Sequence, residues 1–342
     1  WNNLDLTKPV ARWLQGQHAA HGATLTRLTE QVETLAGSFR PDVLVLDEDC
    51  SALQRAAVAA GRRLHARSAV IQHGAPCLPH GFVPLAADRI FAWGETSRKG
   101  MIQWGETPDR IRVTGSPKHD SLWSVARRGR RAGFRREQPR VLLLATRPPV
   151  KGRPDSVEFH LTDATYDAMV HTAFSAAAAL PVGELIVKVH PRANDKAMYE
   201  AVARRFPGMR CKVIHGGDVV DWFLRCDAVI SCASSAGIEA AMFHLPTVQL
   251  LPQGAGDILP AHEWGMSASA RDEDELVEAL RASLQGTAPR ESRLDATFAN
   301  RRRPAALQIA DALCETITEQ AEHPVGFRLL NETVPRVAAG VD

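Results

Sequence analysis

The 342-residue sequence lacks several features that would assign a function class directly. It contains no G-x-x-x-x-G-K-[ST] and no G-x-G-x-x-G segment, so the fingerprints of phosphate-loop NTPases and of dinucleotide-binding folds are missing. No apolar run approaches the roughly 18 residues that indicate a membrane span. The formal net charge of +2 is far from the basic excess of nucleic-acid-binding proteins. We therefore expect no nucleic-acid partner.

Cysteine is present but not in metal-binding or disulfide-framework spacing. None of the six cysteines forms a C-x-x-C pair, and the sequence shows no recognisable signal peptide. Both observations favour a cytoplasmic protein. The sequence begins at Trp1 rather than Met, and its first half contains only about four strand-length runs. We therefore expect the N-terminal Rossmann-like unit to be incomplete.

What the sequence does contain is a regular alternation of short apolar runs with helical periodicity. A long helix is expected over 8–36, followed by strands over 42–47, 68–72, 89–93, 110–114, 141–145, 184–189, 210–214, 228–231 and 247–251. Helices are expected over 51–64, 96–104, 118–128, 165–179, 195–205, 219–224, 236–243, 273–284 and 304–319. Strands that alternate with helices at this spacing form parallel sheets. The sequence thus predicts an α/β fold with two Rossmann-like, doubly wound domains.

A strand, a loop of small hydroxyl residues and a helix are predicted over Cys226–Met242. Ser231, Ser234 and Ser235 lie where the strand meets the helix, whose free N–H groups can bind phosphate. Gly237 leaves room for a close approach, and the carboxylate of Glu239 can accept hydrogen bonds from ribose hydroxyls. The alternative is an ordinary serine N-cap with a glutamate in the first turn.

A second polar group lies at the end of the strand predicted over 184–189. Lys188, His190 and Arg192 occur within five residues, and Pro191 ends the strand. Three cationic or potentially cationic groups at one strand end can neutralise a phosphate or diphosphate. The alternative is a structural histidine in an ordinary strand.

These two segments together resemble a known set of enzymes. Lys-x-His-Pro at 188–191, followed by Ser-Ser-x-Gly-x-Glu-Ala at 234–240, is similar to bacterial GT-B transferases of surface-polysaccharide synthesis. These include CDP-glycerol glycerophosphotransferases and capsule, Kdo and sialyltransferases. The stretches 87–97 and 109–120 look like the same superfamily, and also like UDP-N-acetylglucosamine 2-epimerases, which share its fold. The resemblance covers roughly residues 40–320.

The resemblance implies two domains facing a cleft and supplies a division of the chain. Residues 1–129 would form the N-terminal acceptor-side domain, 130–139 a basic linker, and 140–303 the nucleotide-donor-binding domain. Residues 304–320 would form a C-terminal helix and 321–342 a tail. In such enzymes His190, Ser234, Ser235 and Glu239 would contact the donor nucleotide, and the loop that contains Gly216 would lie near its base. Arg147 would contact phosphate or the donor sugar.

Candidate catalytic groups follow two predicted strands of the first half. Glu48 and Asp49 come directly after one strand, and His73 follows the next. An inverting transfer needs a general base, and Gln72-His-Gly74 resembles the His-Gly turn of the glycerophosphotransferases. The acidic residues 47–49 could be that base instead, or could orient His73. Structural alternatives are a helix cap for the acidic group and a loop contact for His73.

These patterns predict a cytoplasmic, metal-independent glycosyltransferase, associated with the inner face of the membrane or with a larger polysaccharide-synthesis complex. It would move a group from a CMP-, CDP- or UDP-linked donor to a glycan or lipid-linked glycan acceptor, without a further cofactor. One alternative is a nucleotide-sugar 2-epimerase or hydrolase, against which Gln72 stands where that family carries a catalytic glutamate. Another is a catalytically silent nucleotide-sugar-binding domain. The Asp-x-Asp pattern of Asp47 and Asp49 is interpreted as incidental, so no metal site is predicted.

Overall fold

The computed structural model describes residues 7–129, 137–145, 162–191, 195–232, 234–253, 259, 261–287, 294–299 and 303–322. Two predicted donor-binding residues, Arg147 and Arg192, lie outside the described residues, as do most of the predicted linker and almost all of the predicted tail. Among the described residues, no helix is both long enough and apolar enough to cross a membrane.

The larger sheet contains six parallel strands and the point where the winding of the chain reverses. Its spatial order is β10-β9-β8-β5-β6-β7. The strands are β5 (Arg140–Ala145), β6 (Glu184–Val189), β7 (Cys211–His215), β8 (Ala228–Cys232), β9 (Thr247–Leu250) and β10 (Ala268–Ala270). The chain starts in the middle at β5, moves outward to β7, and then returns to β8 on the other side of β5. This is the doubly wound arrangement, whose switch point lies between β5 and β8.

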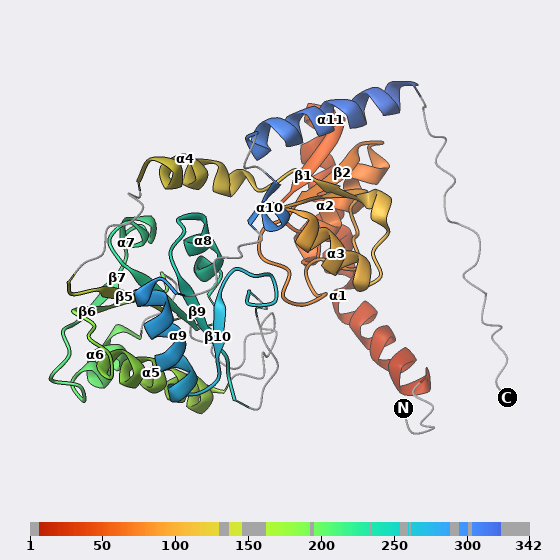
Figure 1. The fold of residues 1–342 in the computed structure, drawn as a ribbon. Helices are drawn as coiled ribbons and strands as arrows, with labels where there is room; N and C mark the ends of the chain where they lie inside the picture. The colour runs from red at the N-terminus through yellow and green to blue at the C-terminus, as the bar shows by residue number, and fades with distance from the viewer. Residues whose placement is uncertain are drawn as a thin grey trace.

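Helices cover both faces of this sheet because its strands are apolar on both sides. Helices α5 (Asp163–Ala178), α6 (Lys196–Ala203) and α9 (Glu273–Gln285) pack on the face that Val187 and Val189 occupy. Helices α7 (Val220–Phe223) and α8 (Ala236–Met242) pack on the face that Leu144 and Ile186 occupy. Figure 1 shows these two layers on opposite sides of the strands.

The smaller sheet has four parallel strands in sequence order: β1 (Val43–Leu46), β2 (Arg67–Ile71), β3 (Arg89–Ala92) and β4 (Ile111–Val113). Helices α2 (Ala52–Arg63) and α3 (Glu95–Gln103) pack on one face through Val58 and Met101. Helix α11 (Ala305–Glu322) packs on the other face through Ile309 and Ala312, so the end of the chain returns to the first sheet (Figure 1). The long helix α1 (Thr7–Phe39) lies against α2.

A short connection leads from the first sheet to the second. It includes the 3₁₀ turn η2 (Pro117–His119) and helix α4 (Asp120–Gly129), whereas a first 3₁₀ turn, η1 (Pro108–Arg110), precedes β4. The Asp120 carboxylate accepts hydrogen bonds from the backbone N–H groups of Ala305 (2.8 Å) and Ala306 (3.0 Å). It thereby satisfies free donors at the start of α11. The fold confirms the predicted α/β class with parallel sheets.

Candidate functional site

The carboxyl edges of the two sheets face each other across a polar contact. Lys118 and His119 follow β4, and Glu239 lies in α8, the helix that follows β8. The Lys118 Nζ atom donates to a Glu239 carboxylate oxygen at 2.7 Å, and His119 Nε2 lies 3.3 Å from the same oxygen. Because open α/β sheets bind ligands beyond their carboxyl edges, this contact marks the region where a ligand site is expected.

The electrostatics of this contact favour an ionised glutamate. Burial works to raise the pKa of the Glu239 carboxyl group, but hydrogen bonds and positive charge from His119 and Lys118 outweigh burial and lower it. An ionised carboxylate only accepts hydrogen bonds, so His119 donates through Nε2. The His119 side chain is completely buried, whereas the Lys118 side chain is 59% exposed. Glu239 is therefore already engaged in holding the two edges together.

An aromatic cluster encloses His119 where the edges meet. The Trp93 ring contacts the His119 ring edge to face, with centroids 4.9 Å apart, and Phe298 contacts it from another side at 4.8 Å. Trp123 of α4 packs edge-on against Phe298 at 6.4 Å. These rings come from three separate parts of the chain. Their burial gives the junction an apolar interior next to the Lys118–Glu239 ion pair.

Gly94, which follows β3, allows the chain near α10 (Leu294–Thr297) to approach closely. A Cβ atom at position 94 would lie 2.3 Å from the carbonyl oxygen of Ala296 and 2.5 Å from that of Thr297. The backbone N–H of Ala299 donates to the carbonyl of Trp93 at 2.8 Å in the same place. Backbone is thus packed on backbone here, which only glycine permits.

On the second sheet, polar side chains form a row near the carboxyl ends of neighbouring strands. The row runs across four neighbouring strands in register. It consists of Lys188 in β6, Leu144 in β5, Ser231 in β8 and Gln249 in β9, of which only Leu144 is apolar. All four side chains are buried. The Gln249 amide oxygen lies 3.3 Å from the backbone nitrogen of His262, and the amide nitrogen donates to the carbonyl of Leu259. Gln249 thus fixes the chain that follows β9, a role the sequence did not indicate.

Lys188 is the predicted phosphate contact with the clearest electrostatic signature. Burial lowers the pKa of its ammonium group, while the negative charge of Asp218 works in the opposite direction. The Nζ atom makes only a long contact of 3.5 Å with the carbonyl of Val189. A buried ammonium in this state gains free energy from an anionic ligand because the anion compensates for lost hydration.

The serine-rich start of α8 is arranged by packing. Ser231 is buried, and its hydroxyl donates to the carbonyl of Ser234 at 3.2 Å. A Cβ atom at Gly237 would lie 2.5 Å from the Ser231 hydroxyl oxygen. The glycine is therefore required for close contact between α8 and β8, and the ligand approach that the sequence suggested stays a prediction. Ser234 is half-buried and Ser235 is exposed.

The remaining predicted donor residues lie at the carboxyl ends of β6 and β7. His190 directly follows β6 and is half-buried. Gly216 and Gly217 follow β7 with positive φ angles of 84° and 72°, a left-handed turn that favours glycine. Their positions agree with loops at one edge of the sheet, and no contact tests their predicted roles.

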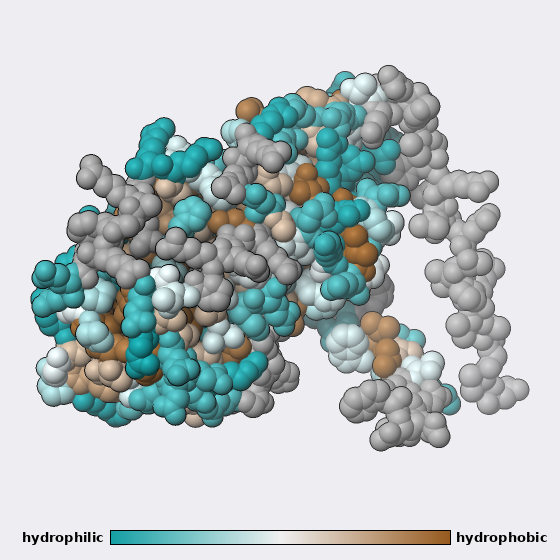
Figure 2. Space-filling view, in the orientation of Figure 1, coloured by the Kyte–Doolittle hydropathy of each residue, from teal (hydrophilic) through white to brown (hydrophobic). Residues whose placement is uncertain are grey.

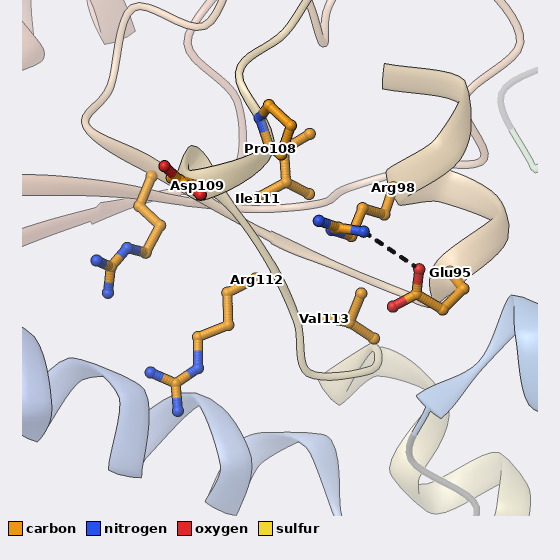
Figure 3. A pocket seen from close by; sticks show the side chains of 8 residues that line it. Glu95, Arg98, Pro108, Asp109, Ile111, Arg112 and Val113 are labelled. Carbon is orange, nitrogen blue, oxygen red and sulfur yellow. Dashed lines mark ion pairs between the residues drawn. The ribbon is translucent and has the colours of Figure 1, made fainter. Parts of the chain in front are cut away.

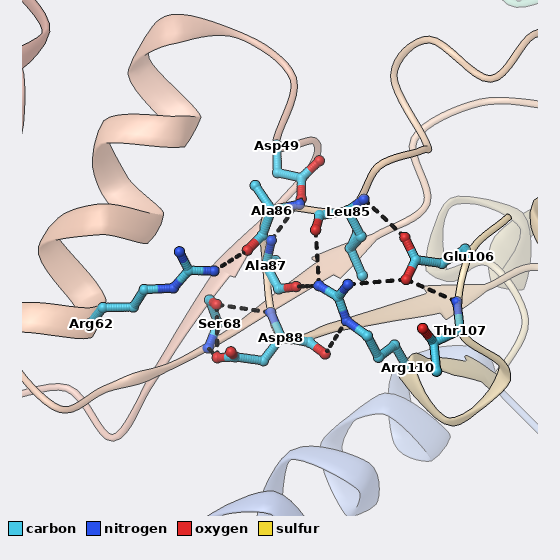
Figure 4. Close-up of polar contacts among 10 residues, drawn as sticks. All are labelled: Asp49, Arg62, Ser68, Leu85, Ala86, Ala87, Asp88, Glu106, Thr107 and Arg110. Atoms are coloured by element: carbon cyan, nitrogen blue, oxygen red, sulfur yellow. Dashed lines mark hydrogen bonds and ion pairs between the residues drawn. The ribbon is translucent and has the colours of Figure 1, made fainter. Parts of the chain in front are cut away.

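Asp49, which follows β1, supports the backbone of the first sheet. Its buried carboxylate accepts hydrogen bonds from the backbone N–H groups of Ala86 (2.5 Å) and Ala87 (2.8 Å), which precede β3 (Figure 4). The guanidinium of Arg110 donates to the carbonyls of Leu85 (2.9 Å) and Ala87 in the same segment. The segment is therefore held by the buried Asp49 carboxylate and by the half-buried Arg110 guanidinium. A general base in contact with substrate needs exposure that Asp49 lacks.

Gln72 and His73, which follow β2, have different environments. Gln72 is buried: its amide oxygen accepts from the Trp93 backbone N–H at 2.8 Å, and its amide nitrogen donates to the Gly74 carbonyl at 2.7 Å. The His73 ring is exposed, is stacked on Phe82 at 5.1 Å, and has Nδ1 3.2 Å from the carbonyl oxygen of Asp47. Since a carbonyl only accepts, this contact places the proton on Nδ1 and leaves Nε2 as the basic nitrogen.

Glu48, the second acidic candidate, is half-buried. It follows β1, the strand that pairs with β2, and His73 follows β2. One of its carboxylate oxygens accepts a hydrogen bond from the Cys50 thiol at 2.7 Å. Together with burial, this contact raises the pKa of the thiol to about 11. Among the described residues, no group of three His, Cys, Asp or Glu side chains is arranged to hold a metal ion.

A further depression lies along the outer strand β4 of the first sheet. Arg89, Arg98 and Arg112 line it (Figure 3). Arg98 forms an ion pair with Glu95 at 3.6 Å, and Arg112 forms one with Glu315. Because carboxylates already pair with these guanidinium groups, we assign no ligand to this depression.

The fold is shared with solved structures of nucleotide-sugar enzymes. The UDP-GlcNAc 2-epimerase of Methanocaldococcus jannaschii, in complex with UDP-GlcNAc and UDP, matches with a TM-score of 0.59 and 14% identity over 86% of this chain and 82% of that one. The Neisseria meningitidis UDP-GlcNAc 2-epimerase bound to UDP-GlcNAc matches with a TM-score of 0.59 and 14% identity over 85% of this chain and 81% of that one. Anabaena Alr3699/HepE in complex with UDP matches with a TM-score of 0.54 and 17% identity over 84% of this chain and 82% of that one.

No protein-family description and no curated protein matches the sequence. At these low identities, the structural matches establish the fold: an α/β architecture of the GT-B type, like that of the UDP-sugar epimerases.

The sequence analysis missed the roles of Lys118 and His119. They lie in the segment 109–120 that resembles the superfamily, but nothing in that segment indicated a contact with Glu239, 121 residues away.

Proposed function

We propose that this protein is an enzyme that acts on a nucleotide-linked sugar, with UDP as the nucleotide, bound between the facing carboxyl edges of its sheets. The observation that carries the proposal is the contact of Lys118 and His119 with Glu239, which joins the edges beyond β4 and β8. In doubly wound sheets the ligand lies at such an edge, near the switch point. Support comes from solved structures of the same fold that contain UDP or UDP-GlcNAc.

On the donor side, the diphosphate would interact first with Lys188. Its buried ammonium, with a lowered pKa, gains most from a new anionic partner. The other groups proposed to contact the nucleotide follow strands of the second sheet in the sequence: Arg147, His190, Arg192, Ser234, Ser235 and Gly216. Glu239 is proposed to position the two edges rather than to bind ribose, because Lys118 and His119 already occupy its carboxylate.

On the sugar side, we assign proton transfer to His73. The ring is exposed at the carboxyl edge of the first sheet, and the Asp47 carbonyl directs the basic Nε2 nitrogen away from the backbone. A positioned imidazole of this kind can act as a general base. Asp49 and Gln72 support the surrounding backbone and are not assigned a proton-transfer role.

Between the reactions considered, the fold comparisons favour 2-epimerisation over the glycosyl transfer predicted first from the sequence. Epimerisation at carbon 2 breaks a C–H bond and remakes it on the opposite face of the sugar. The electron pair of the broken bond forms a double bond to carbon 1 and expels UDP, which adds back to carbon 1 when a proton returns to carbon 2. The reaction therefore requires a group that takes up the proton and a group that returns one. His73 would take up the proton, and the half-buried carboxyl group of Glu48, at the end of the neighbouring strand, would be the group that returns one.

Glycosyl transfer remains the second candidate because of Gln72. Its amide is no general acid or base, and both the amide oxygen and the amide nitrogen are already hydrogen-bonded to backbone, at Trp93 and Gly74 respectively. The chain therefore lacks the acidic group that the resemblance to epimerases leads one to expect there. Transfer to an acceptor hydroxyl needs only one base.

Incubation with UDP-GlcNAc in deuterated water, without an acceptor, distinguishes these reactions by proton NMR. Epimerisation predicts a second UDP-sugar with deuterium at carbon 2. Transfer predicts no change until candidate glycan acceptors are added, after which free UDP accumulates. Binding of UDP without turnover under both conditions would contradict an enzymatic role. Absence of UDP binding, measured as a missing rise in thermal stability, would contradict the proposed nucleotide as well.

A further inference from the structure

The N-terminal part of α1 carries large apolar side chains that nothing in the described structure covers. Val10 is 48% exposed, Trp13 is 62% exposed and Leu14 is 54% exposed. Their spacing of three and four residues places them on one side of the helix. This part of α1 projects beyond the first sheet, and apolar atoms are visible on its surface in Figure 2.

The C-terminal part of the same helix is packed differently. Thr29 is buried, and Leu28 and Val32 are half-buried. Glu33 forms an ion pair with Arg63 of α2, with a nitrogen–oxygen distance of 3.0 Å. The apolar side of α1 therefore rests on α2 in its second half and continues without cover in its first half. Exposed apolar side chains that gather in one place indicate a contact with another surface.

The charge of the projecting part identifies the kind of surface. From residue 7 to residue 29 the sequence contains Lys8, Arg12 and Arg27 and no aspartate or glutamate. Lys8 and Arg12 lie four residues apart, and Arg12 is two residues from both Val10 and Leu14. At about 100° per residue, this places the two cations on the side opposite the apolar group. A helix with tryptophan and leucine on one side and cations on the other is suited to an anionic lipid surface.

A second copy of the chain fits this helix less well. A seam between two helices needs apolar side chains every three to four residues along its length. Gln17 and His21 occupy the positions that continue the apolar side between Leu14 and Leu25. Polar side chains at those positions weaken a helix–helix seam, whereas at a bilayer surface they can reach the headgroup layer.

We propose that residues 7–27 of α1 form a docking surface for an anionic membrane. Val10, Trp13 and Leu14 insert at the boundary between headgroups and acyl chains, and Lys8, Arg12 and Arg27 interact with anionic headgroups. The contact is peripheral and is proposed independently of the nucleotide-sugar activity.

The test is vesicle flotation of the whole protein with phosphatidylcholine–phosphatidylglycerol vesicles, compared with pure phosphatidylcholine vesicles. Wild-type protein should float with the anionic vesicles and be released by salt. The double variant Trp13→Gln/Leu14→Gln should lower the partition coefficient about tenfold or more. The matched control is Leu307→Gln on α11, because Leu307 is 53% exposed and Leu14 is 54% exposed; this control should float like the wild type.

Equal thermal midpoints of the variants and the wild type show that the substitutions act on binding rather than on folding. The proposal fails if the wild type does not float with anionic vesicles, or if the α1 variant floats as well as the control. It also fails if sedimentation shows a wild-type dimer that the α1 variant converts to monomer, since the apolar side then belongs to a second copy.

Discussion

Lys118 and Glu239, 121 residues apart in the sequence, form a 2.7 Å ion pair that joins the carboxyl edges of the two sheets. His119 contributes to the same carboxylate from a completely buried position. One ionised group thus contributes to the connection between the two halves of the molecule, and its removal has measurable consequences.

We expect Glu239→Gln to lower the free energy of unfolding at pH 7 by about 1–3 kcal/mol, because hydrogen bonds to a buried charged group are lost. The pKa of Glu239 in the folded protein lies below its ordinary value of 4.5. Its ionised form therefore stabilises the fold above that pH, and the stabilisation is lost as the pH falls through the folded pKa. Urea unfolding at pH 7 and at pH 4 should show a smaller difference between variant and wild type at the lower pH.

Glu200→Gln is the matched control for this variant. Glu200 forms a 3.5 Å ion pair with Lys196 on the surface of α6, and both side chains are about half exposed. An exposed pair of this kind contributes less than about 1 kcal/mol. Equal effects of the two substitutions would contradict a special role for the Glu239 contact.

Gly237→Ala should destabilise the protein by about 1–3 kcal/mol through overpacking, because the new methyl group would lie 2.5 Å from the Ser231 hydroxyl oxygen and 2.8 Å from its Cβ atom. Ser231→Gly removes both obstacles. The double variant should therefore be more stable than the sum of the two single effects predicts, as measured in a double-mutant cycle by urea unfolding. Strict additivity would show that the two positions do not contact each other.

Lys188→Met should separate stability from binding. Burial lowers the pKa of the Lys188 ammonium below its ordinary value of 10.5. Below the folded-state pKa the buried charge therefore destabilises the folded protein, and this destabilisation disappears as the pH rises from the folded-state pKa to 10.5. Methionine has a similar volume and no charge to desolvate. We expect a higher thermal midpoint without nucleotide at pH 7 and an affinity for UDP lowered about tenfold or more. A lower midpoint together with unchanged UDP binding would contradict the proposed phosphate contact.

His73→Ala and Asp49→Ala should have opposite signatures, although the sequence proposed both residues for catalysis. Loss of the exposed His73 base should lower kcat about a hundredfold or more and leave the thermal midpoint nearly unchanged. Loss of Asp49 leaves the backbone N–H groups of Ala86 and Ala87 without a partner and should cost about 1–3 kcal/mol of stability. Asp49→Asn, which keeps an acceptor oxygen, should retain turnover, whereas a catalytic carboxylate would not tolerate it.

The strand and helix pattern was readable from the sequence because it depends on local periodicity. The strand predicted over 184–189 is β6 with the same bounds, and the helix predicted over 273–284 is α9, which ends one residue later. The short strand β10 and the turn of helix α10 were missed, since three or four residues carry too little periodic signal.

The polar residues at the strand ends were also found from the sequence, because a parallel sheet brings its carboxyl ends to one edge. What each of them does was decided by tertiary contacts. Asp49 follows β1 as predicted, but it is buried against the segment before β3, whereas His73, one strand away, is exposed. Two neighbouring strand ends look alike in sequence and differ only in what the rest of the chain places against them.

The sequence by itself therefore determined the α/β class, the order of the elements and the edge where polar groups gather. Only the tertiary structure decided that Glu239 pairs with Lys118 and His119, that Gly237 makes room for Ser231, and that α11 returns to the first sheet. The physical reason is range. Helix and strand periodicity is encoded within about ten residues. The ion pair of Glu239, in contrast, joins residues that are more than a hundred positions apart.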